Sequence, residues 1–277
     1  MDLNLELPND LGYKSRSQQA RIFSESWIER EMYCPSCSSN NLDPLPHGTK
    51  VIDFKCDSCE ERYQIKSTSK PVRNRIMDSE YYTMMNAIQN DLSPNLMLLH
   101  YSKEAWKVQD LLLIPRHLIV PSVIEKRNPL GPDARRAGWT GCNILLTNIP
   151  STGRIFAIEN SMIHHSDVVR KEWARLRFVG RIEPESRGWL VDTLRCVQSL
   201  DRKRFTLQEV YAQFEDELSR LHPENKNIRP KIRQQLQVLR DKGQIKFVGK
   251  GIYEQINPVI ARKFSSIPSF RKRQQST

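Results

Sequence analysis

The chain has 277 residues, of which 38% are hydrophobic and 27% are charged, and this composition is typical of a soluble globular protein with room for two domains. No apolar stretch reaches the roughly 18 residues that a bilayer span needs, and the acidic N-terminal segment does not resemble a signal peptide, so we expect a cytoplasmic protein with no membrane partner. The formal net charge of +11, most of it in residues 183–277, favours a polyanionic partner such as nucleic acid, and a basic surface that is simply solvated is the alternative.

The first predicted element is a helix over residues 15–32, with an apolar stripe that includes Phe23 and Trp27. Glu25 and Glu29 lie four residues apart on one face of this helix. Such acids are usually solvated, although one of them could reach a metal centre. The pattern by itself favours the solvated interpretation.

Four cysteines follow in two C-x-x-C pairs, separated by eighteen residues: Cys34, Cys37, Cys56 and Cys59. Each pair can form a tight turn whose two thiolates converge on one ion, and two such pairs form a tetrahedral sulfur cage that suits Zn²⁺. Disulfides or a redox pair are the alternatives, but two pairs at this separation favour zinc. Four sulfur ligands leave no open position, so the predicted zinc is structural. The remaining cysteines, Cys142 and Cys196, are expected in the core.

The same region carries a second pattern, formed by Asp53, Gln64 and Lys66. Residues 51–54 are predicted to form a strand, and residues 62–66 alternate so that Gln64 and Lys66 share one face. A hairpin between them places Asp53 beside both side chains. A carboxylate and a second oxygen ligand can hold Mg²⁺, and a lysine can orient water and screen charge at a phosphate. This spacing alone is weak evidence, because surface glutamines and lysines on strands are common.

The middle of the chain is predicted to form a mixed α/β domain. After a loop we expect a helix near residues 79–90, buried strands at 96–101 and 110–115, a strand at 154–158 and a helix at 167–176. Residues 127–144 contain two prolines and three glycines and are predicted to be a loop. Residues 177–187 are polar and are predicted to be a linker.

The predicted loop carries Arg135, Arg136 and Trp139, with glycines on either side of the tryptophan. A large aromatic side chain in a basic, glycine-flanked loop suits stacking on a base or insertion beside it. A tryptophan folded back onto the core is an equally good interpretation.

The C-terminal part is predicted to be a winged helix. Amphipathic helices are expected at 188–200, 206–221 and 229–242, with Thr206 and Glu209 forming a capping box, and two short strands follow around a glycine turn. The third helix of a winged helix enters the major groove, and the wing contacts phosphates. The predicted DNA-contacting residues are Arg229, Lys231, Arg233, Gln234 and Gln237 on the helix, and Lys246 and Lys250 on the wing. Protein binding is the alternative use of this fold, and the positive charge favours DNA.

These segments together resemble the DpnI-type methyl-directed restriction endonucleases. The resemblance covers nearly the whole chain and rests on YKSRSQQARI, YCPSC, CDSC, VIDF, YQIK, PLGPDARRAGWTGCNI, SRGW and KIRQQLQVLRDKG. It implies an α/β nuclease domain of the PD-(D/E)xK superfamily with an inserted four-cysteine zinc site over residues 1–182, and a winged helix over 183–257. Residues 258–277 are then a basic tail, which we expect to be disordered.

The resemblance also implies an activity: Mg²⁺-dependent cleavage of both strands of double-stranded DNA at GATC sites whose adenine carries an N6-methyl group. Asp53 would be the metal-holding acid and Lys66 the catalytic lysine, and both domains would read the methylated site, with the Trp139 loop on the catalytic side. Position 64 departs from the family pattern, which has Glu where this chain has Gln. A zinc-containing reader of methylated DNA that is inactive, or has another specificity, is therefore the alternative. We expect a monomer.

Overall fold

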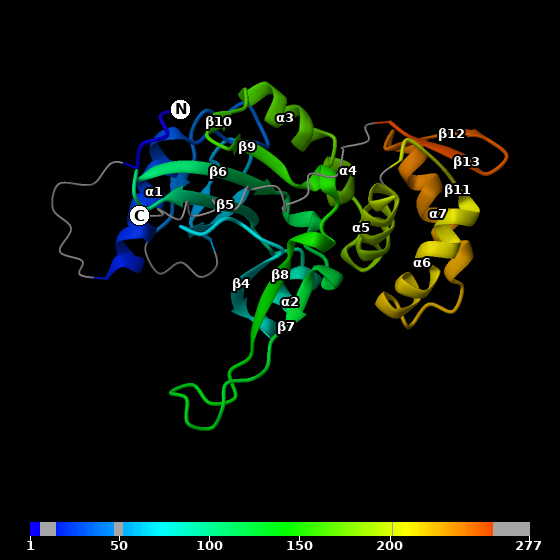
Figure 1. Ribbon diagram of the computed structural model, residues 1–277, viewed down its shortest axis with the longest axis horizontal. Helices are drawn as coiled ribbons and strands as arrows, with labels where there is room; N and C mark the ends of the chain where they lie inside the picture. Colours follow the sequence, from blue (N-terminus) through cyan, green and yellow to red (C-terminus); the bar gives the residue numbers. More distant parts are fainter. Residues whose placement is uncertain (6–14, 47–51, 201, 257–277) are drawn as a thin grey trace, which may run out of the picture.

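The computed structural model describes residues 1–5, 15–46, 52–200 and 202–256. A seven-stranded sheet forms the centre of the N-terminal domain (Figure 1). Its strands, in spatial order, are β1 (Asp43–Pro44), β2 (Phe54–Lys55), β3 (Arg62–Thr68), β5 (Asn95–Ser102), β6 (Lys107–Ile114), β9 (Ile155–Glu159) and β10 (Met162–Ile163). Strands β3 and β5 are parallel, and the other neighbours are antiparallel. The predicted buried strands at 96–101 and 110–115 are confirmed as β5 and β6, whose leucines fill the core.

A smaller antiparallel sheet lies beside the first one, in the order β4 (Arg75–Glu80), β8 (Gly141–Leu145) and β7 (Ile124–Lys126). Helix α2 (Tyr81–Gln89) follows β4 directly, and the Glu80 carboxylate caps it by accepting the N–H groups of Tyr82 and Thr83. The helix predicted near residues 79–90 is confirmed as α2, although Ser79 and Glu80 belong to β4. The prediction that residues 141–144 are part of a loop was wrong, because they form β8. Both segments are strands because they pair with each other, across some 65 residues of sequence.

Helices cover the large sheet, with α1 (Arg16–Glu31) against β3 and α3 (Ser166–Ala174) against β9. The buried residues Phe23, Trp27 and Ile28 form the inward face of α1, as predicted. Short 3-10 turns connect other elements: η1 (Arg116–Leu118), η2 (Pro121–Val123), η3 (Leu146–Asn148) and η4 (Ser151–Gly153). Among the helices of the described ranges, none has both the length and the apolar character that crossing a bilayer requires.

The C-terminal domain has the predicted winged-helix elements: α5 (Pro184–Ser199), β11 (Arg204–Thr206), α6 (Leu207–Leu221), α7 (Ile228–Asp241), β12 (Ile245–Gly249) and β13 (Ile252–Gln255). The capping box of Thr206 and Glu209 is present. Gly243 ends α7 with φ +66°, a backbone conformation that favours glycine. Strand β11 was not predicted, and it adds a third strand to the wing sheet.

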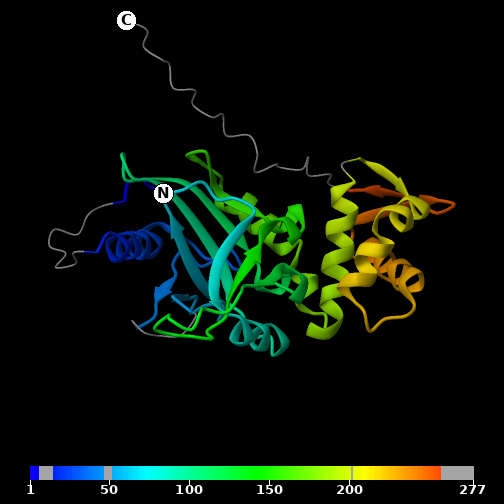
Figure 2. The same cartoon turned by 60° about the horizontal axis from the view of Figure 1, so that its bottom comes forward.

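The predicted linker over residues 177–187 is wrong, because this segment is helical and partly buried. It contains α4 (Arg177–Gly180) and the first turn of α5, where Pro184 occupies a helix-starting position. Helix α5 stands between the two domains (Figure 2) and contacts α2 and α4 on one side and α6 and α7 on the other. The two domains are therefore joined by a packed helix. The predicted basic tail, residues 258–277, lies outside the described residues.

Candidate functional site

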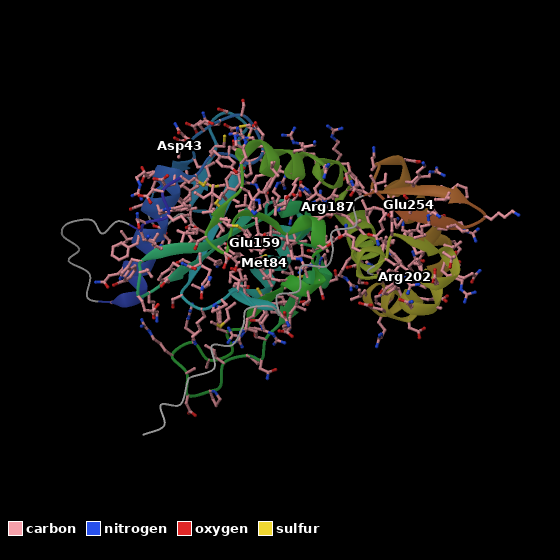
Figure 3. All side chains as sticks on the ribbon, turned by 45° about the horizontal axis from the view of Figure 1, so that its top comes forward. Asp43, Met84, Glu159, Arg187, Arg202 and Glu254 are labelled. Atoms are coloured by element: carbon pink, nitrogen blue, oxygen red, sulfur yellow. The ribbon has the colours of Figure 1, made fainter. Side chains whose placement is uncertain are left out.

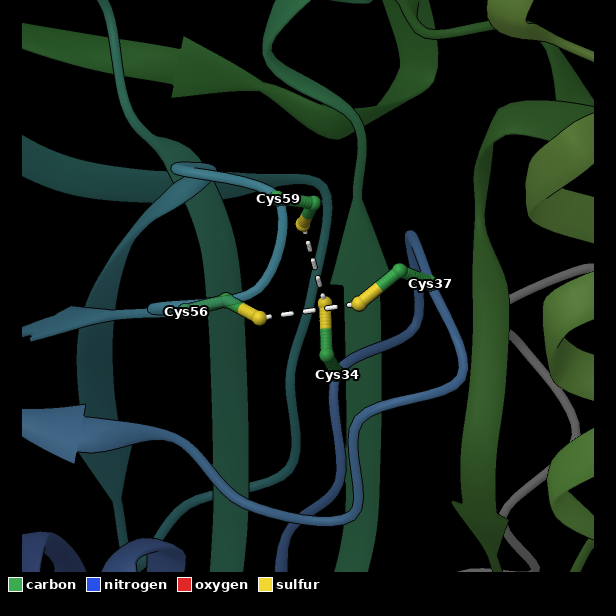
Figure 4. A group of neighbouring side chains, drawn as sticks. All are labelled: Cys34, Cys37, Cys56 and Cys59. Atoms are coloured by element: carbon green, nitrogen blue, oxygen red, sulfur yellow. Dashed lines mark hydrogen bonds between the residues drawn. The ribbon is translucent and has the colours of Figure 1, made fainter.

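The four cysteines converge on one point, as the two C-x-x-C turns predict (Figure 4). Sγ of Cys34 lies 3.6 Å from Sγ of Cys59, and Sγ of Cys37 lies 3.6 Å from Sγ of Cys56. Sulfurs bound tetrahedrally at 2.3 Å from zinc are about 3.8 Å apart, so the cluster fits such an ion. All six cysteines of the chain are free thiols, and Cys142 and Cys196 are buried in the core as expected.

The backbone of the second turn favours a thiolate at Cys56. Burial would raise the pKa of this thiol, but the N–H groups of Cys59 and Ser58 point at its sulfur and lower the pKa to about 7. Burial dominates at Cys34 and raises the pKa of its thiol to about 11. Metal binding at this cluster therefore displaces at least one proton from a buried sulfur.

Contacts from distant elements fix the first cysteine turn. Arg170 of α3 donates from Nε to the Cys34 carbonyl at 3.2 Å and from its terminal nitrogen to the Ser39 carbonyl at 2.8 Å. Arg177 of α4 donates to the Ser36 carbonyl. The hydroxyl of Tyr63, a fully buried residue of β3, lies 3.2 Å from Sγ of Cys34. The cluster thus joins α3, α4 and β3.

The second cysteine turn presents Asp53 to β3. The predicted strand over residues 51–54 is shorter than expected, because β2 begins at Phe54, and Val51 lies outside the described residues. Asp53 is nevertheless held by two hydrogen bonds to β3: its N–H donates to the Tyr63 carbonyl at 2.9 Å, and its Oδ2 accepts the Ile65 N–H at 2.8 Å. Together with Gln64 and Lys66 it lines one open pocket of about 290 Å³. The structure thus brings together the three side chains that the spacing predicts to meet.

Helix α1 forms the other wall of this pocket with Arg21, Ser24 and Glu25. The Glu25 side chain is only 16% exposed, and its Oε1 lies 2.5 Å from Nε of Arg21. A terminal nitrogen of the same guanidinium lies 3.8 Å from Oδ1 of Asp53. The sequence favoured a solvated Glu25, and the structure places it in the pocket instead, whereas Glu29 is exposed. The one available signal was that Glu25 lies within the apolar stripe of α1, between Phe23 and Trp27.

Lys66 also has a partner that no sequence pattern indicated. Its Nζ lies 2.5 Å from Oδ1 of Asp78 on β4, and the Asp78 side chain has no exposed surface. Neither Asp78 oxygen has a hydrogen bond of good geometry from the described residues, so the contact is a charge pair.

The loop between β7 and β8 extends away from the body of the N-terminal domain (Figure 1). Arg135 and Arg136 are exposed on it, and Trp139 is half-buried. The Arg136 guanidinium lies 4.9 Å from the centre of the Trp139 ring, and the ring atoms Cη2 and Cζ3 lie against Gly141, where an added Cβ would be 2.8 Å from Cη2. The structure therefore has Trp139 folded back, and stacking on a base would require the ring to leave this position.

The predicted DNA-contacting residues of the winged helix are distributed as the helical pattern implies. Arg233, Gln234 and Gln237 are exposed on α7, Lys231 is half-buried, and Lys246 and Lys250 are exposed on the wing. Arg229 is already engaged, because its Nε donates to Glu215 at 2.9 Å and its guanidinium lies 5.3 Å from the Tyr211 ring. Arg229 is thus tied to α6, while the other residues are accessible.

A mixed α/β domain with a four-cysteine cluster, followed by a helix-turn-helix domain with a wing, defines a class of DNA-directed proteins. Residues 1–181 match the model of the DpnI, or Dam-replacing, family, and residues 185–255 match its helix-turn-helix domain. The chain belongs to this DpnI family of methylation-dependent restriction endonucleases, as the resemblance implied. DNA binding follows from both matches.

Proposed function

We propose that this protein is a Mg²⁺-dependent endonuclease that hydrolyses both strands of DNA at GATC sites carrying N6-methyladenine. The observation that supports it most is the shared pocket of Asp53, Gln64 and Lys66, at the end of a hairpin held by the cysteine cluster. The zinc in this proposal is structural, and it fixes the turn that follows Asp53.

The donors in the pocket fit a small hard cation. Oδ2 of Asp53 is used by the Ile65 N–H, which leaves Oδ1 to bind a metal, and Glu25 adds a second carboxylate nearby. Gln64 would contribute its amide oxygen, a neutral ligand that Mg²⁺ accepts less readily than a carboxylate. When bound, Mg²⁺ supplies charge stabilisation at the scissile phosphate and lowers the pKa of a bound water.

Lys66 acts on the same phosphate. Its ammonium group can donate to the attacking water or to a non-bridging phosphate oxygen and so offset the negative charge that develops there. Arg21 lies beside both pocket carboxylates in the free protein, and its guanidinium can turn to the DNA backbone once a metal satisfies Asp53.

The methyl requirement can be met in the major groove, where N6-methyladenine keeps one N–H and presents an apolar group. Discrimination needs a close apolar contact for the methyl group and a lost contact for unmodified adenine. The exposed face of α7 and the β7–β8 loop are the surfaces that we assign to this recognition.

Plasmids prepared from adenine-methylating and non-methylating hosts test the proposal. With Mg²⁺, we expect the methylated plasmid to be cut at GATC and the unmethylated plasmid to remain intact. Cutting that ignores methylation, or that maps to other sequences, would reject the stated specificity.

Gln64 favours a second candidate, a reader of methylated DNA without cleavage, because it removes a charge beside the metal. Retention of the methylated plasmid without cutting, in Mg²⁺ or Mn²⁺, would support the reader.

A further inference from the structure

We propose that Asp78 is a positioning residue for the catalytic lysine, an inference that rests on the proposed nuclease function. Its carboxylate contacts Lys66 at 2.5 Å and is fully shielded from solvent. The residues that line the Asp53 pocket do not include Asp78. Asp78 therefore acts on Lys66 from behind and is placed neither to hold the metal nor to touch DNA.

A β-bulge aims Asp78 at the lysine. Strand β4 pairs with β8 in the register Met77 to Asn143 and Glu80 to Gly141, so two residues of β4 face one residue of β8. An extra residue in one strand turns the local backbone and redirects its side chains. At this bulge Met77 is 68% exposed, while the adjacent Asp78 side chain is completely buried.

The partner strand supports the bulge. Cys142, the single residue of β8 opposite it, is fully buried, and its Sγ donates to the Ser79 carbonyl at 3.3 Å. The carboxylate is thus held by backbone that is fixed on both sides. The fixed Asp78 carboxylate can position Lys66 only if the lysine side chain would otherwise move.

Lysine is such a side chain, because its four-carbon stem allows many positions for the ammonium group. Lys66 is 28% exposed at the mouth of the pocket, where water would compete for it. A buried carboxylate that accepts no hydrogen bond from the described part of the chain has a strong requirement for this one cation, so the pair restricts Nζ to a small volume. Asp78 thereby places Nζ at a fixed distance from the pocket in which the phosphate is cut.

The first test is Asp78→Asn, which keeps the shape of the side chain and removes its charge. We expect kcat on methylated plasmid to fall by about tenfold or more, because a displaced catalytic group loses its orientation. Affinity for a methylated duplex in Ca²⁺ should change by less than about twofold, because Asp78 does not touch DNA. Glu125→Gln is the matched control: it removes an acid from the same small sheet, where Glu125 is paired with Arg75, and should leave both quantities unchanged.

The second test uses melting temperature and does not depend on activity. Lys66→Met should lower the melting temperature, because it leaves Asp78 buried without a cation. Adding Asp78→Asn to that variant should restore part of the loss, and this double variant should cleave no more slowly than Lys66→Met alone.

The outcomes distinguish the proposed nuclease function from the positioning role of Asp78. If the wild-type protein does not cleave methylated DNA, the proposed function fails, and the catalytic role of Asp78 fails with it. If wild type and Asp78→Asn cleave equally well, or if the two substitutions lower the melting temperature additively, the proposed function stands and the positioning role is rejected.

Discussion

Residue 64 contributes directly to the charge of the Asp53 pocket, which we propose as the Mg²⁺ site. With glutamine there, Asp53 and Glu25 are the only carboxylates among the lining residues that the structure describes; Arg21 lies beside them, and Lys66 is paired with the buried Asp78. These five charged groups together carry one net negative charge, and a glutamate at position 64 would add a second. Metal affinity should reflect this difference directly.

Replacing Gln64 by Glu should lower the Mg²⁺ concentration needed for half-maximal cleavage by roughly tenfold, since about 1.4 kcal/mol of added attraction corresponds to that factor. A Mg²⁺ titration of the cleavage rate measures the effect. Gln89→Glu, an exposed position on α2, adds the same charge elsewhere and should not shift the titration. An unchanged Mg²⁺ dependence in Gln64→Glu would show that residue 64 is not a ligand.

His117 makes stability depend on pH. Burial above all, and then the charges of Arg187 and Arg116, lower the pKa of its imidazole from 6.5 to about 4. Above pH 6.5 the ring is neutral in the folded and unfolded chains and contributes no pH dependence. Between pH 6.5 and 4 the unfolded chain binds a proton that the folded chain does not, so the unfolding free energy should fall, by up to about 3 kcal/mol.

Urea denaturation at several pH values measures this slope. His117→Gln should flatten it between pH 6.5 and 4. The exposed His165 serves as a control, since His165→Gln should keep the wild-type slope. A slope that is equally steep in the His117 variant would place its origin in other groups.

At the scale of elements, the hairpin from β2 to β3 depends on the cysteine cluster. Cys56 directly follows β2, and its N–H donates to the Glu61 carbonyl at 2.9 Å, so it closes the turn that sets Asp53 against β3. Glu60 within that turn has φ 63°, an unfavourable conformation for a side-chain-bearing residue that the surrounding contacts must maintain. A metal ion at the cluster is the contact best placed to do so.

Cys56→Ser should therefore reduce zinc content below one ion per chain and abolish most cleavage. A loss of roughly 3 kcal/mol would lower the melting temperature by about 10 °C for a chain of this size. Metal analysis, thermal melting and plasmid cleavage on one preparation check the three effects together. Cys196→Ala removes a buried thiol outside the cluster and should keep the zinc. Full cleavage and unchanged melting in Cys56→Ser would contradict the structural role.

Elements with strong local signals could be predicted from the sequence, and elements formed by distant pairing could not. The capping box of Thr206 and the apolar faces of α1 and α7 identified those helices. Strand β4 lacks an apolar alternation and is a strand because β8 pairs with it. For the same reason the sequence spacing predicted that Asp53, Gln64 and Lys66 lie together, whereas no local pattern predicted the contact between Asp78 and Lys66.

The whole molecule is held together at helix α5. Arg187 lies at the junction of the two domains (Figure 3), is buried, and donates to Oδ1 of Asp91 at 2.6 Å and to the Ile182 carbonyl at 2.9 Å. Further along α5, the Asp192 carboxylate contacts both domains, because it accepts the Ser122 hydroxyl at 2.6 Å and lies 2.9 Å from Nε2 of His222. The predicted linker, residues 177–187, is rich in charge because side chains such as Arg187 make these polar contacts. The same charge made the segment resemble an exposed linker.

Arg187→Met should uncouple the two domains, because it leaves the Ile182 carbonyl without its donor and Asp91 with Arg116 as its remaining partner. We expect a loss of about 1–3 kcal/mol and a broader or two-step unfolding transition, followed by circular dichroism in urea. Arg181→Met, at an exposed position nearby, should retain a single transition. A single unshifted transition in Arg187→Met would mean that apolar packing alone couples the domains.

The pairing of β4 with β8 also has a consequence during synthesis on the ribosome. A nascent chain that has not yet emerged past Leu145 has β3 and its lysine, but it lacks the strand against which β4 forms. Such an incomplete product cannot place Asp78, and it also lacks the entire DNA-reading domain. On the proposed function, we expect a fragment ended by a premature stop codon in this interval to leave methylated DNA uncut.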